Sequence, residues 1–458
     1  MFELVSLTSS NLFIMADLIQ PRTLKGFRDY LPSLMIPREE ILQKARTVYR
    51  SFGFAPIDTP ALEYTEILLG KGGAESDKLI YRFKDHGDRD IALRFDLTVP
   101  FARFAAQHVP TLGTPFKRYH MGPVWRGENT AHGRYREFWQ CDFDTIGTTS
   151  NSSDIEAALV INALLAAIGF ERFEIHVNNR LILSGLLEEL GLADKSVAVL
   201  RALDKLPKVG IEPVVEEMVL HGVDAEKGRK VLELAGFKGT NEEILAFVSQ
   251  KFGNNPKAAD GVKRLSELLI VARESGVPDE RLRIDLSIAR GLDYYTGTIF
   301  ETFLSDLPGI GSICSGGRYD NLAGLYTKMP LPGVGASLGL DRLLAAMEEL
   351  KILGGVQASA PVFIVRFADT PIGVYEKLAA TLRAAGIGVE VFIEPKKIGQ
   401  QLQYAEKRGF RFALIAGPDD FASKKFKIKE LATRQEADYD EVIIVSQLRT
   451  MLGIGLPG

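Results

Sequence analysis

Cysteine is scarce in this 458-residue chain, which carries only Cys141 and Cys314. Two thiols cannot form a disulfide framework in a chain of this length, and their scarcity indicates a reducing compartment. Neither belongs to a Cys-x-x-Cys pair and no His-Glu-x-x-His run occurs, so we expect no metal site. We interpret both cysteines as ordinary buried thiols.

Long apolar runs and a strong charge of one sign are also missing. No run approaches the roughly 18 residues of a membrane span, and a secretory signal is not expected because the first basic residue is Arg22. We interpret residues 1–20 as an N-terminal extension, with Met15 as an alternative start. With a net charge of −4 and 46% hydrophobic residues, the sequence predicts a cytoplasmic globular protein without membrane contact.

The first 350 residues combine helical and strand patterns. Apolar residues at helical spacing predict a helix over 36–52, and Ser153–Glu156 forms a capping-box pattern that opens a second helix. Alternating segments typical of antiparallel strands cover 91–95, 116–125, 135–146, 173–177 and 282–286. Helical patterning between the last two predicts a helical insertion at about 190–280.

The composition changes after Leu350, where strand and helix patterns begin to alternate and predict a small α/β domain. Its expected strands are 362–367, 389–393, 412–416, 426–428 and 442–445. Lysines gather at 424–429 and at Lys396 and Lys397. The 424–429 group is either a set of phosphate contacts or the protection of a solvated edge strand.

Two glycine clusters resemble nucleotide or hydrolase motifs without matching them. The 333–339 cluster has one residue too many for a dinucleotide fingerprint, and 311–316 is followed by Gly317 where a P-loop needs lysine. Ser337 has the spacing of a hydrolase nucleophile, but no histidine follows it. We interpret both clusters as places where backbones approach one another or a ligand.

Arginines at the ends of expected strands are the strongest chemical signal. Arg126, Arg134, Arg290 and Arg342 stand beside glycines and aromatic residues. A single such arginine is usually a structural ion-pair partner, but several together favour a polyanion site. This pattern indicates phosphoryl or nucleotidyl transfer, in which charge neutralisation carries much of the catalysis.

These arginines lie in motifs that resemble class II aminoacyl-tRNA synthetases, and specifically the histidyl-tRNA synthetase family. The three class-wide motifs correspond to 51–60, 116–146 and 333–344. Two stretches resemble histidyl-specific motifs, Arg290–Glu301 and Ser315–Leu322. Leu93–Pro100 resembles the variant common in eukaryotic and archaeal-type members. The third class motif has Asp341 where the class usually has glutamate.

The resemblance implies an α+β fold with a class II catalytic core over 21–350. This core is expected to hold a mostly antiparallel sheet of about six or seven strands, with the helical insertion inside it. An α/β anticodon-binding domain would follow at 360–458. The implied activity is that of a histidine–tRNA ligase, which forms histidyl-adenylate from histidine and ATP and transfers histidine to tRNA(His). ATP with Mg²⁺ would be a substrate, no tightly bound cofactor is expected, and the expected assembly is a homodimer.

The resemblance also implies residue roles. Arg126 would bind the α-phosphate and Arg342 the γ-phosphate of ATP, while Glu128 and Arg134 orient the nucleotide. Arg290 would bind the substrate carboxylate and the α-phosphate, so Arg290 and Arg126 are the expected catalytic residues. Arg126 also belongs to the histidine site, together with Asp96, Thr98 and Gln140 at the α-ammonium, Asp144 and Tyr295 at the imidazole nitrogens, and Tyr294 and Tyr319 as lining.

One alternative is a non-catalytic histidine-sensing regulatory subunit of ATP phosphoribosyltransferase. Such proteins resemble the catalytic core but generally lack the anticodon domain and lose nucleotide-binding residues. Arg126, Glu128, Arg290 and Arg342 are all present here, and a long segment follows Ala360. Both features favour the ligase.

Overall fold

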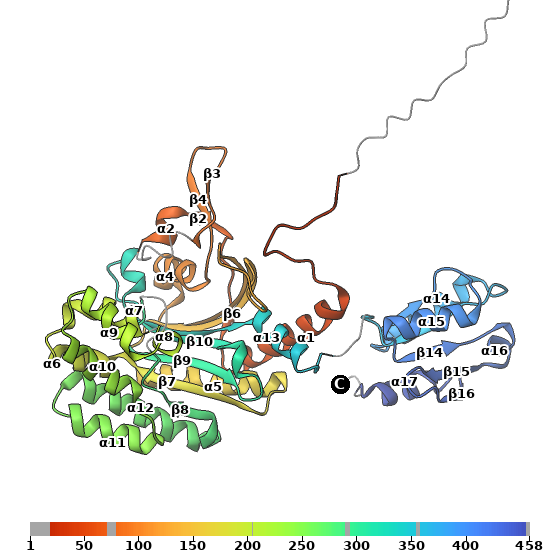
Figure 1. Ribbon diagram of the computed structural model, residues 1–458. Coiled ribbons are helices and arrows are strands. Elements are labelled where there is room, and N and C mark those ends of the chain that lie inside the picture. The colour runs from red at the N-terminus through yellow and green to blue at the C-terminus, as the bar shows by residue number, and fades with distance from the viewer. Residues whose placement is uncertain (1–18, 71–78, 204, 289–293, 354–357, 455–458) are drawn as a thin grey trace, which may run out of the picture.

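The computed structural model describes residues 19–70, 79–203, 205–288, 294–353 and 358–454. Most of the expected N-terminal extension therefore lies outside the described residues. Figure 1 shows the chain from residue 19 onward as a sheet-based body and a smaller C-terminal unit. The two units are described separately below.

An eight-stranded sheet forms the centre of the larger unit. Its strands, in spatial order, are β1 (Ala55–Pro56), β5 (Phe116–Trp125), β6 (Glu137–Ile146), β11 (Gly333–Gly339), β10 (Cys314–Tyr319), β9 (Thr298–Leu304), β7 (Phe173–Asn179) and β8 (Leu282–Ile284). All pairs are antiparallel except β1 with β5 and β7 with β8. The sheet exceeds the expected size because short edge strands of two and three residues are added at its ends.

Four helices pack with this sheet around the main hydrophobic core: α1 (Pro32–Ser51), α5 (Asn151–Ile168), α12 (Pro256–Glu274) and α13 (Leu340–Glu349). Helix α5 is the one described helix long and apolar enough to cross a membrane, but more than half of it is buried in this core. The N-cap residue of α5 is Ser150, whose side chain accepts a hydrogen bond from the Ser152 N–H. The expectation that a capping box at Ser153 begins this helix is therefore wrong. Cys141 and Cys314 are both buried in the same core, as expected.

The connection from β7 to β8 is helical. It holds α6 (Arg180–Glu189), α7 (Ser196–Leu203), α8 (Leu206–Val209), α9 (Ile211–Leu220), α10 (Ala225–Gly236), α11 (Asn241–Phe252) and α12. Side-chain caps begin four of these helices: Asn179 for α6, Asp224 for α10, Thr240 with Glu243 for α11, and Asn255 for α12. In Figure 1 these helices gather beside β7 and β8.

A second, three-stranded sheet projects from the body in Figure 1. Its strands lie in the order β2 (Leu62–Tyr64), β4 (Asp90–Leu93) and β3 (Arg82–Lys84), with α2 (Thr65–Leu69) beside them. Helix α4 (Thr98–Leu112) follows β4 and buries Val99, Phe101 and Ala102 in a cluster that also contains Tyr319. This packing brings the first turn of α4 to the aromatic end of β10.

The C-terminal unit has its own five-stranded sheet, ordered β13 (Val389–Val391), β12 (Val362–Val365), β14 (Phe412–Ile415), β15 (Lys425–Glu430) and β16 (Glu436–Asp440). Its helices are α14 (Ile372–Ala384), α15 (Ile398–Arg408), α16 (Pro418–Ser423) and α17 (Ile444–Leu452), and apolar clusters lie among them.

One expectation for this unit is wrong, and so is one of the two alternatives for the lysine-rich segment. The strand expected at 442–445 is instead the entry to α17, where Ile444 and Leu448 are buried one helical turn apart. The lysine-rich strand β15 lies between β14 and β16, so it is not an edge strand. The true edge, β16, was missed because its mostly exposed residues, Glu436–Asp440, show no apolar alternation.

Candidate functional site

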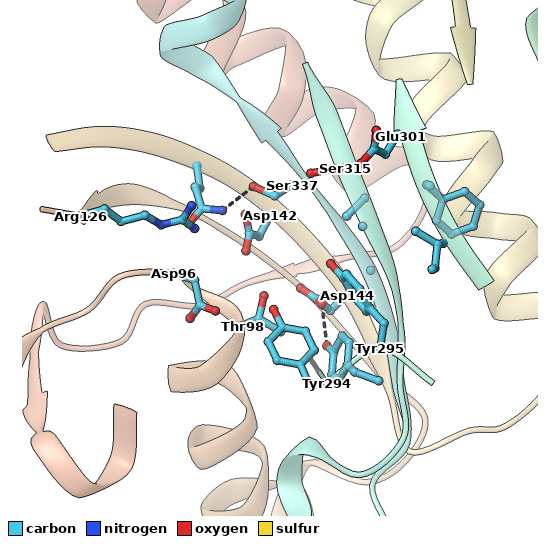
Figure 2. A pocket seen from close by; sticks show the side chains of 17 residues that line it. Asp96, Thr98, Arg126, Asp142, Asp144, Tyr294, Tyr295, Glu301, Ser315 and Ser337 are labelled. Atoms are coloured by element: carbon cyan, nitrogen blue, oxygen red, sulfur yellow. Dashed lines mark hydrogen bonds between the residues drawn. The ribbon is translucent and has the colours of Figure 1, made fainter. Parts of the chain in front are cut away.

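A cavity of about 170 Å³ opens on the face of the eight-stranded sheet that carries the polar side chains. Residues Gln140, Asp142 and Asp144 alternate along β6, so all three point to this cavity. Figure 2 shows Asp144, Tyr294 and Tyr295 grouped at one end, while Arg126 lies at the other. The cavity therefore has an acid and phenols at one end and a guanidinium at the other.

Asp144 is the most constrained acid of the cavity. Its Oδ2 lies 2.6 Å from Nη2 of Arg118, and its Oδ1 accepts a 2.6 Å hydrogen bond from the Tyr319 hydroxyl. Burial raises the pKa of Asp144, and Arg118 and the Tyr319 hydrogen bond oppose that rise. Burial raises the pKa of the Tyr295 phenol, and the nearby charge of Asp144 raises it further. An acceptor and two phenols thus converge at this end.

Glycines on β10 and β11 make room for these side chains. Gly335 lies directly across from Asp144, and a Cβ there would be 2.2 Å from Asp144 Oδ1. A Cβ at Gly333 would be 2.4 Å from the ring of Tyr319. The glycine clusters therefore permit close approach, as the sequence indicated.

Four buried oxygens that line the cavity, one each from Asp96, Gln140, Asp142 and Asp144, lack a hydrogen-bond partner within the described part of the chain. Two of them belong to Asp96 and Gln140. Asp96 Oδ1 accepts from the Val99 N–H at 3.0 Å, but Oδ2 has no partner. Gln140 donates through Nε2 to Ser337 at 2.9 Å, and its Oε1 is likewise unpaired. Buried acceptors without donors are costly, so both fit a ligand that brings a cluster of N–H groups. Burial raises the pKa of Asp96 to about 6.

A second cavity, of about 180 Å³, adjoins the first and shares Arg126 and Gln140 with it. Arg126 is fixed by a 2.8 Å hydrogen bond from Nε to the Phe95 carbonyl and lies over the ring of Phe138. Arg342 donates from Nη1 to the Ser312 carbonyl at 2.6 Å.

The guanidiniums of this second cavity share one carboxylate. Glu128 pairs with Arg134 and lies 3.6 Å from Arg126. Burial lowers the pKa of Arg342, and the nearby Arg134 and Arg126 lower it further. Three guanidiniums held together against their mutual repulsion form a site that favours a polyphosphate.

The structure brings the sequence-predicted residues into these two cavities. The first is lined by Asp96, Thr98, Arg126, Gln140, Asp144, Tyr294, Tyr295 and Tyr319, and the second by Arg126, Glu128, Arg134 and Arg342. Arg290 lies outside the described residues, so its expected role stays a prediction. No cluster of metal-ligating side chains occurs among the residues that the structure describes.

Sequence reasoning missed several residues of the site. Asp142, Ser315 and Ser337 line the first cavity, and the buried Arg118 holds Asp144 from behind. The alternation Gln140, Asp142, Asp144 was a readable signal for Asp142, because every second residue of a strand shares a face. Arg118 could not be found in this way, since its partner is set by the pairing of β5 with β6.

Comparisons with known proteins identify the families that the chain matches. Residues 26–343 match the family model described as Histidyl-tRNA synthetase, and residues 362–449 match the model described as Anticodon binding domain. A curated Histidine--tRNA ligase from Rhodopirellula baltica is 62% identical over 422 residues, covering 92% of this chain and 96% of the relative.

Solved structures give the same result. The histidyl-tRNA synthetase of Nostoc sp. PCC 7120 is 34% identical, with a TM-score of 0.86 that covers 95% of this chain and 100% of that one. A chain described as an ATP phosphoribosyltransferase regulatory subunit/histidyl-tRNA synthetase from Bacillus halodurans C has a TM-score of 0.69 at 23% identity, covering 82% of this chain and 93% of that one. The latter similarity is one of fold alone.

Proposed function

This chain belongs to the histidyl-tRNA synthetase family, and we propose that its two adjoining cavities bind histidine and ATP side by side. The activity is that of an aminoacyl-tRNA synthetase, the ligation of histidine to tRNA. The observation that carries the site assignment is the sharing of Arg126 and Gln140 by the two cavities. A carboxylate bound beside Arg126 would lie next to the α-phosphate of a nucleotide in the second cavity.

The first cavity takes histidine in one orientation. The α-ammonium would donate to the unpaired oxygens of Asp96 and Gln140, with Thr98 nearby. Asp144 and Tyr295 would take one imidazole nitrogen each, since a neutral imidazole carries one donor and one acceptor. Tyr294 and Tyr319 close the pocket around the ring. A site of this kind discriminates strongly, because a wrong side chain leaves buried polar groups unpaired.

The second cavity takes the triphosphate. Arg126 would hold the α-phosphate and Arg342 the γ-phosphate, with Glu128 and Arg134 orienting the nucleotide. A histidine carboxylate oxygen attacks the α-phosphorus, and the bond to pyrophosphate breaks. The guanidiniums stabilise the charge that develops on the phosphoryl oxygens. Arg290 is proposed, from its motif, as the catalytic cation that bridges carboxylate and α-phosphate.

The transfer step completes the reaction. The terminal ribose hydroxyl of tRNA attacks the carbonyl carbon of the adenylate, and AMP leaves. Magnesium would enter with the phosphates of ATP, as is usual for this ion. Glu128 in the second cavity and Glu301 in the first both act to raise the pKa of Arg342, so these two carboxylates would be near enough to share such an ion.

We assign tRNA binding to the C-terminal unit and, in part, to the helical insertion at about 190–280. The assigned domains are 21–350 for catalysis and 360–458 for the anticodon. Two lysines of β15, Lys427 and Lys429, pair with one acid of β16, Glu436, at 3.2 and 3.7 Å. Such exposed pairs are weak, so a phosphate could replace the acid.

We further propose a cytoplasmic homodimer. Large apolar side chains are exposed on the three-stranded sheet, where Leu62, Tyr64 and Phe83 keep 43%, 50% and 46% of their surface. This sheet follows the first class motif at 51–60, and burial against a second copy would cover it.

The regulatory alternative is not favoured. The chain is 62% identical to a curated ligase, whereas its resemblance to the regulatory-type chain is one of fold at 23% identity. The distinguishing experiment is ATP–pyrophosphate exchange with each of the twenty amino acids supplied singly, without tRNA. Exchange with histidine alone supports the ligase. Histidine binding without exchange would support the regulator.

A further inference from the structure

One buried cation sits behind the histidine cavity and has no part in the roles assigned so far. Arg118 is fully buried on β5, directly across from Asp144 on β6. Its Nη2 lies 2.6 Å from Asp144 Oδ2 and 3.9 Å from Asp142 Oδ2. The same nitrogen donates to the Leu97 carbonyl at 3.2 Å, and the guanidinium stacks 4.3 Å from the centre of the Phe101 ring.

The buried pair of Arg118 and Asp144 is not well explained by a contribution to the stability of the fold alone. Burying an ion pair costs desolvation energy that its attraction often fails to recover. Arg118 recovers even less of this desolvation energy, because its Nε and Nη1 make no hydrogen bond within the described part of the chain. Replacement of a buried ion pair by well-packed apolar side chains is often neutral or stabilising. The cation is therefore better explained by what it does to the carboxylates beside it.

We propose that Arg118 is a positioning residue that keeps Asp144 an ionised, correctly oriented acceptor for the imidazole N–H of histidine. This inference rests on the proposed function and deepens it. Arg118 forms an ion pair with one oxygen of Asp144, and Tyr319 donates a hydrogen bond to the other, so the carboxylate is contacted from two sides. Across from Asp144, Gly335 carries no side chain, which leaves that side of the carboxylate open.

A cation is needed beside Asp144 because other carboxyl groups lie close to it. Asp142, Asp96 and Glu301 line the same cavity as Asp144, so four carboxyl groups share one buried space. Without Arg118, desolvation and mutual repulsion would favour protonation of Asp144. A protonated Asp144 would donate rather than only accept, and it could no longer select the N–H of the ring. The groups that face Asp144 are Arg118 from β5, Asp142 from β6, Tyr319 from β10, Tyr295 ahead of β9, and Asp96 ahead of α4.

The test compares Arg118→Met and Arg118→Lys with wild type in ATP–pyrophosphate exchange from pH 7 to 8.5. We expect Arg118→Met to raise the histidine KM about 10- to 100-fold at pH 7, the range expected when the hydrogen bond from the imidazole N–H loses its charged acceptor. The ATP KM and kcat should change little. The ratio of variant to wild-type histidine KM should fall as the pH rises, because base restores the ionised acceptor. Taking the ratio removes the titration of histidine itself. Arg118→Lys keeps the charge and should lie between the two.

Two further measurements separate positioning from simple structural damage. If Arg118 acts through Asp144, its removal should add little to the histidine KM of an Asp144→Asn variant. The matched control is Arg318→Met, which removes another buried Arg–Asp pair, that of Arg318 with Asp154. It should lower the melting temperature without giving a pH-dependent KM ratio.

Each outcome decides something. A KM ratio that is independent of pH, or equal rises in the histidine and ATP KM values, would overturn the positioning role. If Arg118→Met does not fold, the same ratio measured on Arg118→Lys decides the matter, and a wild-type value throughout would also overturn the role. Absence of histidine-dependent exchange in the wild-type protein would instead refute the proposed function.

Discussion

The carboxylate of Asp341 accepts a 2.7 Å hydrogen bond from the backbone N–H of Trp139, which ties the first turn of α13 to β6. Its other oxygen receives Arg28 at 3.2 Å and the hydroxyl of Tyr30. Arg342 is the next residue along the helix, so the contacts of Asp341 hold the backbone that carries the Arg342 side chain. The shorter aspartate, where related enzymes usually have glutamate, thus retains a full set of partners.

Removal of the Arg342 guanidinium should impair the use of ATP. We expect Arg342→Ala to lower kcat/KM for ATP about 10²- to 10³-fold, the usual cost of losing one donor that stabilises developing charge. Histidine binding, measured by calorimetry without ATP, should stay near the wild-type value. A comparable loss of histidine affinity would contradict the division of the site into two cavities.

Neutralising Asp144 should act on the other substrate. Asp144→Asn keeps the size of the side chain but replaces an acceptor oxygen with a donor. We expect the histidine KM in pyrophosphate exchange to rise far more than the ATP KM. Equal effects on both would show that Asp144 supports the fold and does not read the ring.

A methyl group at position 335 should close the histidine pocket. Its Cβ would lie 2.2 Å from Asp144 Oδ1 and 2.3 Å from the Phe143 carbonyl, so either Asp144 or the strand must move. We expect Gly335→Ala to abolish measurable histidine binding. Gly339→Ala on the same strand is the matched control, because its Cβ meets nothing closer than 3.7 Å. Similar losses in both variants would indicate general damage to β11.

The buried acid Asp96 should make the free energy of unfolding depend on pH. Burial raises its pKa from 3.8 to about 6, so the unliganded folded state holds its proton where the unfolded chain has released it. The folded state therefore binds more protons between pH 4 and 6, and this contribution to the free energy of unfolding falls as the pH rises. Asp96→Asn lacks the titration. Its free energy of unfolding, relative to wild type, should increase from pH 4 to 6 in urea titrations, and a constant difference would contradict the shift.

Deletion of residues 361–458 should separate the two steps of the reaction. The described part of this segment has its own sheet and apolar clusters, so its removal should leave the larger core folded. We expect histidine-dependent pyrophosphate exchange to persist, while charging of tRNA(His) loses most of its kcat/KM for tRNA. Charging at the full-length rate would refute the anticodon-binding assignment.

Long, alternating segments could be predicted from the sequence, and polar or very short ones could not. The strand 116–125 was predicted with the bounds it has in the structure, since it is long and is preceded by Gly113 and Pro115 and followed by Gly127. Strand β16 was missed because its residues are exposed and polar, and the apolar start of α17 was taken for a strand because a short run has no clear period.

The same distinction holds for the site. Asp144 and Arg342 were predicted because they stand in recognisable motifs. Arg118 was not, because its role depends on which residue of β6 lies across from it, and that register emerges only when the strands pair. Contacts between distant segments are the part of the site that local patterns do not encode.

The two buried thiols provide a built-in reporter of how the catalytic sheet opens. Cys141 on β6 and Cys314 on β10 have almost no exposed surface, and burial raises the pKa of both thiols, so they should resist alkylation in the native state. Residues 361–458 contain no cysteine. The rate at which an alkylating reagent modifies the unaltered chain therefore follows excursions of the sheet that carries the site, without interference from the C-terminal unit. Histidine and ATP should slow that rate if they bind where the cavities lie.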